Sequence, residues 1–333
     1  MKMSLEPGEG SDGGPPAAST RPRPSLALGP GGPRGLSASA TTPEGDGGTL
    51  LQQALRHAVQ HLQEPEDDGL RRAAVEELRT WVMDQPHLNA RTDDWSLTCF
   101  LRGCKYKQDR ARRKITSYYE MRSRVPEWFN QRDPTLPPLM DLLKLGVFLP
   151  LRNKDEEGRT VVLIRAAVHD PYKQKQSDVF KIGKMLVDLL LETDEIISIY
   201  GVFAIVDLQG VTLGHALQLT PPVIKKAVHA WQDCYPVRTR SMEFINAPVY
   251  VNVVLNIFRK FMNDKLKKRV HVHSKSLVAL HKVVSPSILP EEYGGTCGTL
   301  QELKDYWLEQ AVGKRLWFLE NEKHKADLSK KQQ

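Results

Sequence analysis

The segment GVFAIVDL, residues 201–208, decides the fold class of this chain. Every residue from 202 to 206 is apolar, and the run is too short for a typical helix. A short, continuous apolar run of this kind is typical of a strand that is buried on both faces of a sheet. Because such a strand requires helices on both sides of the sheet, the segment predicts an α/β fold.

The segments around this strand alternate between strand-like and helix-like patterns. Residues 147–152 (VFLPLR) and 160–168 (TVVLIRAAV) are short and branched, and the polar turn NKDEEG between them predicts a strand pair. The other predicted elements are helix 177–197, helix 222–233, strand 240–246, helix 248–262 and helix 300–321. This alternation favours a mixed, largely parallel sheet flanked by helices.

The chain before the sheet consists of a tail and a helical unit. Residues 1–47 are rich in Gly, Pro, Ser and Ala, so they bury too little apolar surface to offset the entropy of ordering, and we expect disorder. Apolar spacings of three and four predict helices near 49–62, 70–81 and 108–124, and another helix with Thr92 as its N-cap. The expected domains are the tail (1–47), an N-terminal helical unit (48–136), the α/β domain (137–298) and a C-terminal helix with a charged tail (299–333).

Composition and charge say more about the cellular compartment of the protein than about its function. The 333 residues carry a net charge of +7, which is modest for a dedicated nucleic-acid-binding protein. The cysteines Cys99, Cys104, Cys234 and Cys297 are scattered without a CxxC pair, which favours reduced thiols in the cytoplasm. We find no secretory signal pattern and no apolar run near the roughly 20 residues that span a bilayer. We therefore expect a soluble protein whose contact with membranes is peripheral.

Signatures of catalysis and of metal binding are weak. The sequence lacks GxGxxG after a strand, GxxxxGK[ST], GxSxG and HExxH. Asp207 ends the most apolar strand, where α/β enzymes often place an acid, but a lone carboxylate favours a structural role. His271 and His273 would share one side of a strand, and two imidazoles are too few for a metal site. We expect no enzyme activity, no catalytic residue and no metal.

In residues 256–274, NIFRKFMNDKLKKRVHVHS, the end of an apolar stripe on the predicted helix 248–262 meets dense positive charge. The stripe has helical spacing and consists of Val251, Val254, Leu255, Phe258, Phe261 and Met262. A surface helix with a solvated basic end is one interpretation, and nucleic-acid binding is another. Because the aromatic residues lie on the apolar face rather than among the cations, we favour the edge of an anionic bilayer, where apolar insertion and lysine or arginine charge act together.

Five segments in this order resemble the CRAL-TRIO family of hydrophobic-ligand transfer proteins. They are FLRGCKY, GVFAIVDLQGV, TPPVIKKAVHAWQDCYPVR, EFINAPVYVNVVLNIFRKFMNDKLKKRVHVHS and ILPEEYGG. The resemblance covers about residues 49–321 and is greatest to the tocopherol-transfer, retinaldehyde-binding and clavesin branches of the family. It implies a helical N-terminal unit on an α/β lipid-binding domain, with a hydrophobic cavity that a movable segment, residues 248–269, closes.

The resemblance also implies two groups of site residues. Phosphoinositide-binding positions of the family match Arg238, Arg240, Lys265 and Arg269. A further arginine of that site is replaced by Cys104. The adjacent Lys105 is a candidate to compensate for it, although on a helix its side chain would point elsewhere. Ligand-facing positions match Phe180, Val187, Val202, Ala204, Val206, Met242, Val254 and Phe258.

The ligand class remains open, because Gly183 and Val187 stand where tocopherol-binding members have serines. By resemblance we expect a monomeric, non-enzymatic carrier of a tocopherol, a retinoid or a similar lipid, with no cofactor besides that ligand and no nucleic-acid partner. It would release its ligand at phosphoinositide-containing endosomal or plasma membranes. The alternative is a phosphoinositide-binding adaptor whose cavity holds a permanent structural lipid.

Overall fold

A computed structural model of the chain describes residues 47–249, 251–273 and 277–330. The described residues belong to one unit of the chain, Gly45–Gln333. The tail expected to be disordered lies outside the described residues, except for Gly47, where helix α1 begins.

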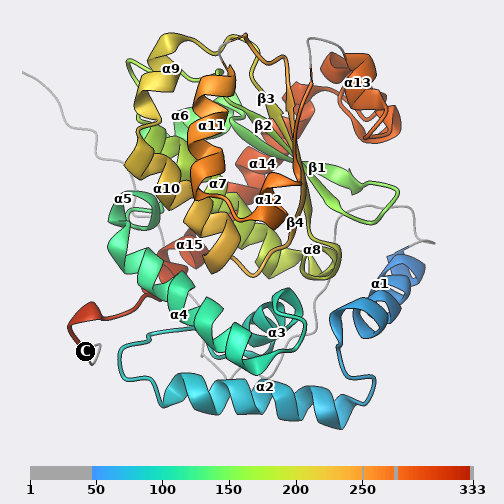
Figure 1. The fold of residues 1–333 in the computed structure, drawn as a ribbon, viewed down its shortest axis with the longest axis vertical. Helices are drawn as coiled ribbons and strands as arrows, with labels where there is room; N and C mark the ends of the chain where they lie inside the picture. The colour runs from blue at the N-terminus through green and yellow to red at the C-terminus, as the bar shows by residue number, and fades with distance from the viewer. Residues whose placement is uncertain (1–46, 250, 274–276, 331–333) are drawn as a thin grey trace, which may run out of the picture. The chain divides into compact units, whose positions relative to one another are not determined.

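The core of this unit is a five-stranded sheet with the order β1-β2-β3-β4-β5 (Figure 1). The strands are β1 (Phe148–Lys154), β2 (Thr160–Arg165), β3 (Val202–Asp207), β4 (Thr239–Ile245) and β5 (Val270–Val272). β1 is antiparallel to β2, whereas β2, β3, β4 and β5 are parallel. The predicted mixed, largely parallel sheet is thus confirmed, and all residues of β3 are buried. β5 falls where His271 and His273 would share one side of a strand, and its three residues give too short a pattern to predict it otherwise.

Helices lie on both sides of the sheet, as the apolar β3 requires. Figure 1 shows α10 (Pro221–His229) and α11 (Val251–Phe261) on one side and α13 (Leu277–His281) on the other. The remaining helices of the sheet region are α7 (Gln176–Thr193), α8 (Glu195–Tyr200), α9 (Leu213–Gln218), the π-helical turn η1 (Ala230–Cys234), α12 (Asp264–Lys267), the 3-10 turns η2 (Pro286–Ile288) and η3 (Glu291–Tyr293), α14 (Leu300–Gly313), α15 (Arg315–Asn321) and the 3-10 turn η4 (Leu328–Lys330).

The N-terminal part of this unit is helical. Its elements are α1 (Gly47–Leu62), α2 (Asp68–Met83), α3 (Asp94–Gly103), α4 (Gln108–Arg124), α5 (Pro126–Phe129) and α6 (Pro137–Leu145). The prediction of Thr92 as an N-cap is wrong by one residue, because the Asp93 side chain accepts the hydrogen bond from Ser96 N.

Two predicted helices are broken in the structure. Helix 177–197 ends at Thr193, and Asp194 then caps α8 by accepting a hydrogen bond from Ile196 N at 3.0 Å. Asp194 has an extended backbone conformation, so its carboxylate satisfies a free N–H of the new helix. Helix 300–321 is interrupted at Lys314, between α14 and α15.

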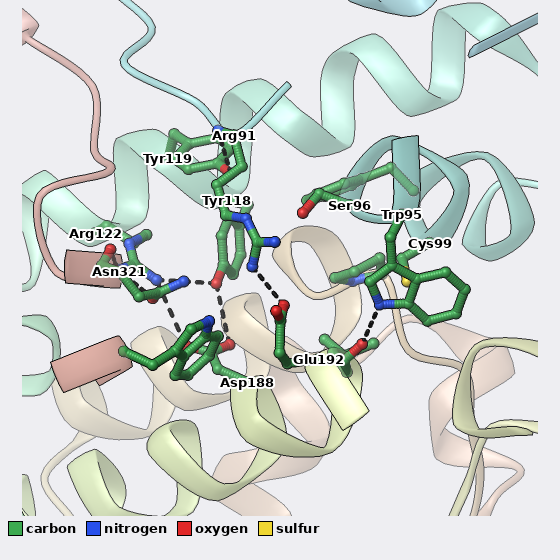
Figure 2. A pocket seen from close by; sticks show the side chains of 14 residues that line it. Arg91, Trp95, Ser96, Cys99, Tyr118, Tyr119, Arg122, Asp188, Glu192 and Asn321 are labelled. Carbon is green, nitrogen blue, oxygen red and sulfur yellow. Dashed lines mark hydrogen bonds and ion pairs between the residues drawn. The ribbon is translucent and has the colours of Figure 1, made fainter. Parts of the chain in front are cut away.

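A buried network of charges fixes α7 to the helices around it (Figure 2). The Asp188 carboxylate accepts a hydrogen bond from the Tyr118 hydroxyl at 3.0 Å and pairs with Arg122 at 3.4 Å and Arg132 at 2.7 Å. Arg122 also donates to the backbone oxygen of Asn321 at 2.5 Å and to its side-chain oxygen at 2.9 Å. The three charged side chains are almost fully buried, so the network ties α7 to α4 and to α15.

Two further polar contacts extend this attachment to α3 and the segment before it. Arg91 pairs with Glu192 at 2.6 Å, and the Trp95 indole donates to the backbone oxygen of Leu191 at 2.7 Å. Figure 2 shows these contacts around a small pocket of about 50 Å³. Because the polar groups of the pocket bond one another, we interpret it as a structural joint.

We predict that Asp188→Asn strongly destabilises the protein. The substitution leaves Arg122 and Arg132 buried without a counter-charge, and losing one partner of a buried ion pair costs about 3–5 kcal/mol. Urea unfolding measures the change in the free energy of unfolding. Asp178→Asn is the control on the same helix, because its partly exposed carboxylate lies 3.8 Å from Lys181 and should contribute less than about 1 kcal/mol. Equal losses for both variants would contradict the role given to Asp188.

Candidate functional site

An apolar cavity of about 220 Å³ lies between the sheet and helices α7, α10 and α11. This volume is far above the roughly 15 Å³ that a single water requires. The sheet contributes Ile164, Val206 and Phe244, which lie toward the carboxyl ends of three neighbouring strands. Carboxyl ends of parallel strands are the usual location of ligand sites in α/β folds, so the cavity is the first candidate for a binding site.

Five of the eight side chains expected to face a ligand line this cavity. They are Phe180, Val206, Met242, Val254 and Phe258. Val187, Val202 and Ala204 are buried but do not line it. Val187 and Val202 pack in the main core cluster, and Ala204 precedes the carboxyl-terminal half of β3, which is the part that the cavity reaches. Their identification as ligand-facing residues is therefore corrected to ordinary core packing.

Helix α11 forms one wall of the cavity. Its apolar stripe turns Val251, Val254, Leu255 and Phe258 toward the cavity, while Val253 on the opposite side is 67% exposed. Met262 and Leu266 extend the same wall into α12. The segment that the sequence marks as amphipathic thus presents its apolar face to an internal cavity rather than to a solid core.

α11 has no polar anchor to the rest of the fold within the described residues. Among the described residues, the Arg259 guanidinium donates to the Asn256 side chain of the same helix at 3.2 Å. The first polar contact with another element comes just after the helix, where Asn263 N donates to the Gln232 side chain at 2.8 Å. Apolar contacts with residues such as Ile224 and Val228 of α10 hold α11 in place. The two walls of the cavity are therefore held differently, α7 by buried charges and α11 by apolar packing.

Arg238 stands at the start of a cluster of cations near the amino-terminal ends of β3 and β4. Its guanidinium donates to the backbone oxygens of Arg102 at 3.0 Å, Ser198 at 3.1 Å and Ile199. Carbonyl groups accept these hydrogen bonds without neutralising the charge of Arg238, and its buried Nε has no hydrogen-bond partner among the described residues. Burial lowers the pKa of Arg238 to about 9, and the charges of Arg240 and neighbouring arginines add to this effect.

Arg240 and Arg269, like Arg238, donate hydrogen bonds to backbone oxygens. Arg240 donates to the backbone oxygen of Tyr200 at 2.5 Å, and Arg269 donates to that of Thr239. Burial lowers both pKa values, and the nearby charge of Arg269 further lowers that of Arg240. Neither arginine forms an ion pair with a carboxylate in the described part of the chain.

Lys265 of α12 is the fourth of the expected phosphoinositide-binding residues, and Lys105 lies near it. Lys265 is exposed, and its pKa is lowered by partial burial and then by the charges of Arg269 and Lys105. The structure thus brings Arg238, Arg240, Lys265 and Arg269 together, with Lys105 beside them. The objection that Lys105 would point elsewhere assumes a helix, and the structure contradicts this assumption, because α3 ends at Gly103 and Lys105 adopts a left-handed backbone with φ 54°. We call these five residues the cation cluster.

Asp207 has a structural role. Its carboxylate accepts hydrogen bonds from the Tyr293 hydroxyl at 2.6 Å, the Asn246 amide at 2.8 Å and Gln209 N at 2.9 Å. These bonds tie the segment after η2 and the loop after β4 to the carboxyl end of β3. A carboxylate with this many donors is satisfied as a structural acceptor.

His271 and His273 lie on one side of β5 and its continuation, and both contact Glu243 of β4. His271 Nδ1 is 2.9 Å and His273 Nε2 is 2.6 Å from the two carboxylate oxygens. Burial alone would raise the pKa of Glu243, but hydrogen bonds from Ser241 and both histidines hold it below its usual value. Across the described residues, no group of three or more potential ligands is placed to hold a metal ion.

The four cysteines are unpaired, and three of them are buried. Burial raises the pKa of the Cys104 thiol and raises that of Cys234 to about 12. These thiols are therefore protonated at neutral pH and behave as small apolar side chains.

Comparisons with known proteins identify the family of this chain. A family model for the CRAL/TRIO domain matches residues 145–295, and a model for a Pinta-like UBA domain matches residues 67–139. Clavesin-2 of Homo sapiens is 30% identical over 222 residues, which cover 66% of this chain and 68% of the relative. Clavesin-1 of Xenopus laevis is 30% identical over 223 residues, covering 67% of each protein.

One solved structure, titled Crystal structure of Sfh5, aligns with 75% of this chain and 99% of its own, at 14% identity and a TM-score of 0.48. In the regions that the structure describes, no helix is long and apolar enough to cross a bilayer.

We predict that a small polyanion binds the cation cluster and stabilises the fold. A bound anion would offset the mutual repulsion of the arginines, and at 100 times its Kd a ligand stabilises by about 2.7 kcal/mol. Thermal unfolding with increasing pyrophosphate should raise the Tm of the unmodified chain. The double variant Lys265→Ala/Arg269→Ala should lose most of this rise.

Lys267→Ala/Lys268→Ala is the matched control, because it removes the same charge from the adjacent residues and Lys267 is paired with Asp264 at 3.2 Å. The control should keep the rise in Tm. Equal responses from both double variants would show that pyrophosphate senses only net charge.

Proposed function

The chain belongs to the CRAL-TRIO family, whose members bind hydrophobic lipids, and we propose that it is a non-enzymatic carrier of one such molecule. In this proposal the ligand occupies the cavity beneath α11 and leaves it at a membrane that displays phosphoinositides. The observation that carries the proposal is the apolar cavity wall formed by α11, a helix without a polar anchor elsewhere in the described residues.

Apolar packing suits α11 to act as a gate, because the free-energy cost of moving it outward depends on whether its side chains enter water or lipid. Val251, Val254, Leu255 and Phe258 would each lose about 1.5–3 kcal/mol on exposure to water, or roughly 6–12 kcal/mol together. In solution this cost keeps the cavity closed. At a bilayer the same side chains exchange the cavity for acyl chains, so most of the cost disappears.

Exposed apolar side chains near α11 support a membrane-facing role. Val249 is 99% exposed and Val253 is 67% exposed, and Leu213 and Leu217 of α9 are 70% and 68% exposed. Both α9 and α11 border the cavity. Inserting these side chains between lipids would bring the ligand to the membrane surface.

The cation cluster supplies the second part of the proposal, recognition of the headgroup. Lys265 and Arg269 follow α11 directly in the chain, so a phosphate bound to them acts on the segment that closes the cavity. Arginine offers paired donors to phosphate, lysine a compact charge, and each cation near an anionic surface contributes about 1 kcal/mol. If headgroup binding favours the open state, opening must lower the affinity for the ligand reciprocally.

The proposal places the protein in the cytoplasm, attached peripherally to endosomal or plasma membranes. It needs no cofactor besides the bound lipid. A tocopherol, a retinoid or another hydrocarbon-rich molecule would suit the apolar lining.

Transfer of a fluorescent lipid between vesicles tests the proposal. We expect the protein to accelerate transfer, and more so when the acceptor vesicles contain a bisphosphorylated phosphoinositide. Lys265→Ala/Arg269→Ala should reduce that additional acceleration roughly 30-fold, since two surface cations contribute about 2 kcal/mol. The loss should be largest at low salt, where exposed charges are least screened.

Lys267→Ala/Lys268→Ala again serves as the control and should transfer as the unmodified chain does. Vesicle binding without transfer by the unmodified chain would contradict the carrier role and favour an adaptor with a permanently bound lipid.

A further inference from the structure

Lys184 is a buried cation in the wall of the apolar cavity. It lies on α7, lines the cavity beside Phe180 and Gly183, and is 1% exposed. Its ammonium nitrogen lies 3.9 Å from the centre of the Trp231 ring and 4.8 Å from that of Tyr235. These aromatic faces give partial compensation for the charge, but no carboxylate lies within ion-pair distance among the described residues.

The nearest carboxylate along the helix is already occupied. Asp188, one turn further on α7, pairs with Arg122 and Arg132. This buried group therefore contains more cations than carboxylates before Lys184 is added. Burial accordingly lowers the pKa of Lys184 to about 7, although Asp188 opposes the shift.

The two other titratable side chains of the cavity wall, Arg165 and His215, have partners. Arg165 donates to the backbone oxygen of Leu145 at 2.9 Å. His215 Nδ1 lies 2.8 Å from the Thr212 hydroxyl, and its Nε2 lies 3.0 Å from the backbone oxygen of His169. Lys184 thus differs from them: although it is almost fully buried, it has no hydrogen bond or ion pair among the described residues, so a ligand could supply its partner.

We propose that the ligand is a hydrophobic monocarboxylic acid whose carboxylate pairs with Lys184. This inference rests on the proposed function, since it requires the cavity to hold a hydrophobic molecule. The apolar lining receives the hydrocarbon part, and the ammonium receives the acid group.

The charge of the ligand follows from the surroundings of Lys184. A single buried ammonium is matched by a single negative charge, whereas a doubly charged phosphate would bring an unpaired charge into an apolar site. An ester or alcohol offers a neutral acceptor, which makes a weaker hydrogen bond to an ammonium than a carboxylate does. The preference for the acid over its ester is therefore the property that Lys184 sets.

Binding of straight-chain acids of 12–20 carbons and of their methyl esters tests this inference. Displacement of a fluorescent lipid from the full chain gives the affinity for each ligand. We expect the best acid to bind roughly 10- to 100-fold more tightly than its own ester, the factor that a hydrogen-bonded charge contributes. Lys184→Met should remove this preference, because it lowers the affinity for the acid far more than the affinity for the ester.

Lys181→Met is the matched control. Lys181 is also buried on α7, but it does not line the cavity and lies 3.8 Å from Asp178. This variant should retain the preference for acids.

The possible failures are distinguishable. Equal binding of acids and esters to the unmodified chain would overturn the inference and leave the carrier function standing, as would a preference that persists in Lys184→Met. If neither acids nor esters nor the fluorescent lipid bound, the proposed function would fail and the inference with it. The comparison of acid with ester on the unmodified chain decides even if Lys184→Met does not fold.

Discussion

The cavity depends on the different ways in which its two walls are held. α7 is fixed by the buried pairs of Asp188 with Arg122 and Arg132, which would each be costly to separate. α11 also lines the cavity but packs through apolar side chains, without a polar bond to another element in the described residues. Apolar contacts have no direction and can be exchanged for lipid, so one wall can move while the other keeps its shape. A container with one rigid and one exchangeable wall is suited to loading and unloading.

The cation cluster would make opening of the cavity sensitive to anions. Arg238, Arg240 and Arg269 hold their positions by donating to backbone oxygens, so their charges remain available to an outside anion. Their mutual repulsion is a cost that the folded chain carries until an anion binds. Because Lys265 and Arg269 continue directly from α11, the site that senses the anion and the wall that opens belong to one segment. Inside the cavity, Lys184 is likewise a cation without a carboxylate partner among the described residues, but it is a single buried charge.

The fold could be predicted from the sequence more fully than the site. The apolar run 202–206 indicates a doubly covered strand whatever its neighbours, and the structure confirms it. Which residues of β3 line the cavity was harder to predict, because Val202 and Val206 share a face of the strand but only Val206 reaches the cavity. The contribution of Lys105 depends on a left-handed backbone that no helical pattern indicates. Lys184 is buried against aromatic rings from a segment that is distant in sequence. Its position in the sequence pattern of helix α7 therefore does not predict its burial.

Restricting the motion of α11 tests the central claim most directly. A reducible disulfide introduced between α10 and α11, in protein already loaded with a fluorescent lipid, would hold the exchangeable wall closed. Release to phosphoinositide-containing vesicles should then stop and return to the unmodified rate on reduction, while the cysteine variant in its reduced state transfers normally throughout. Undiminished release from the crosslinked protein would show that the lipid leaves by another route and would contradict the role of α11 as the gate.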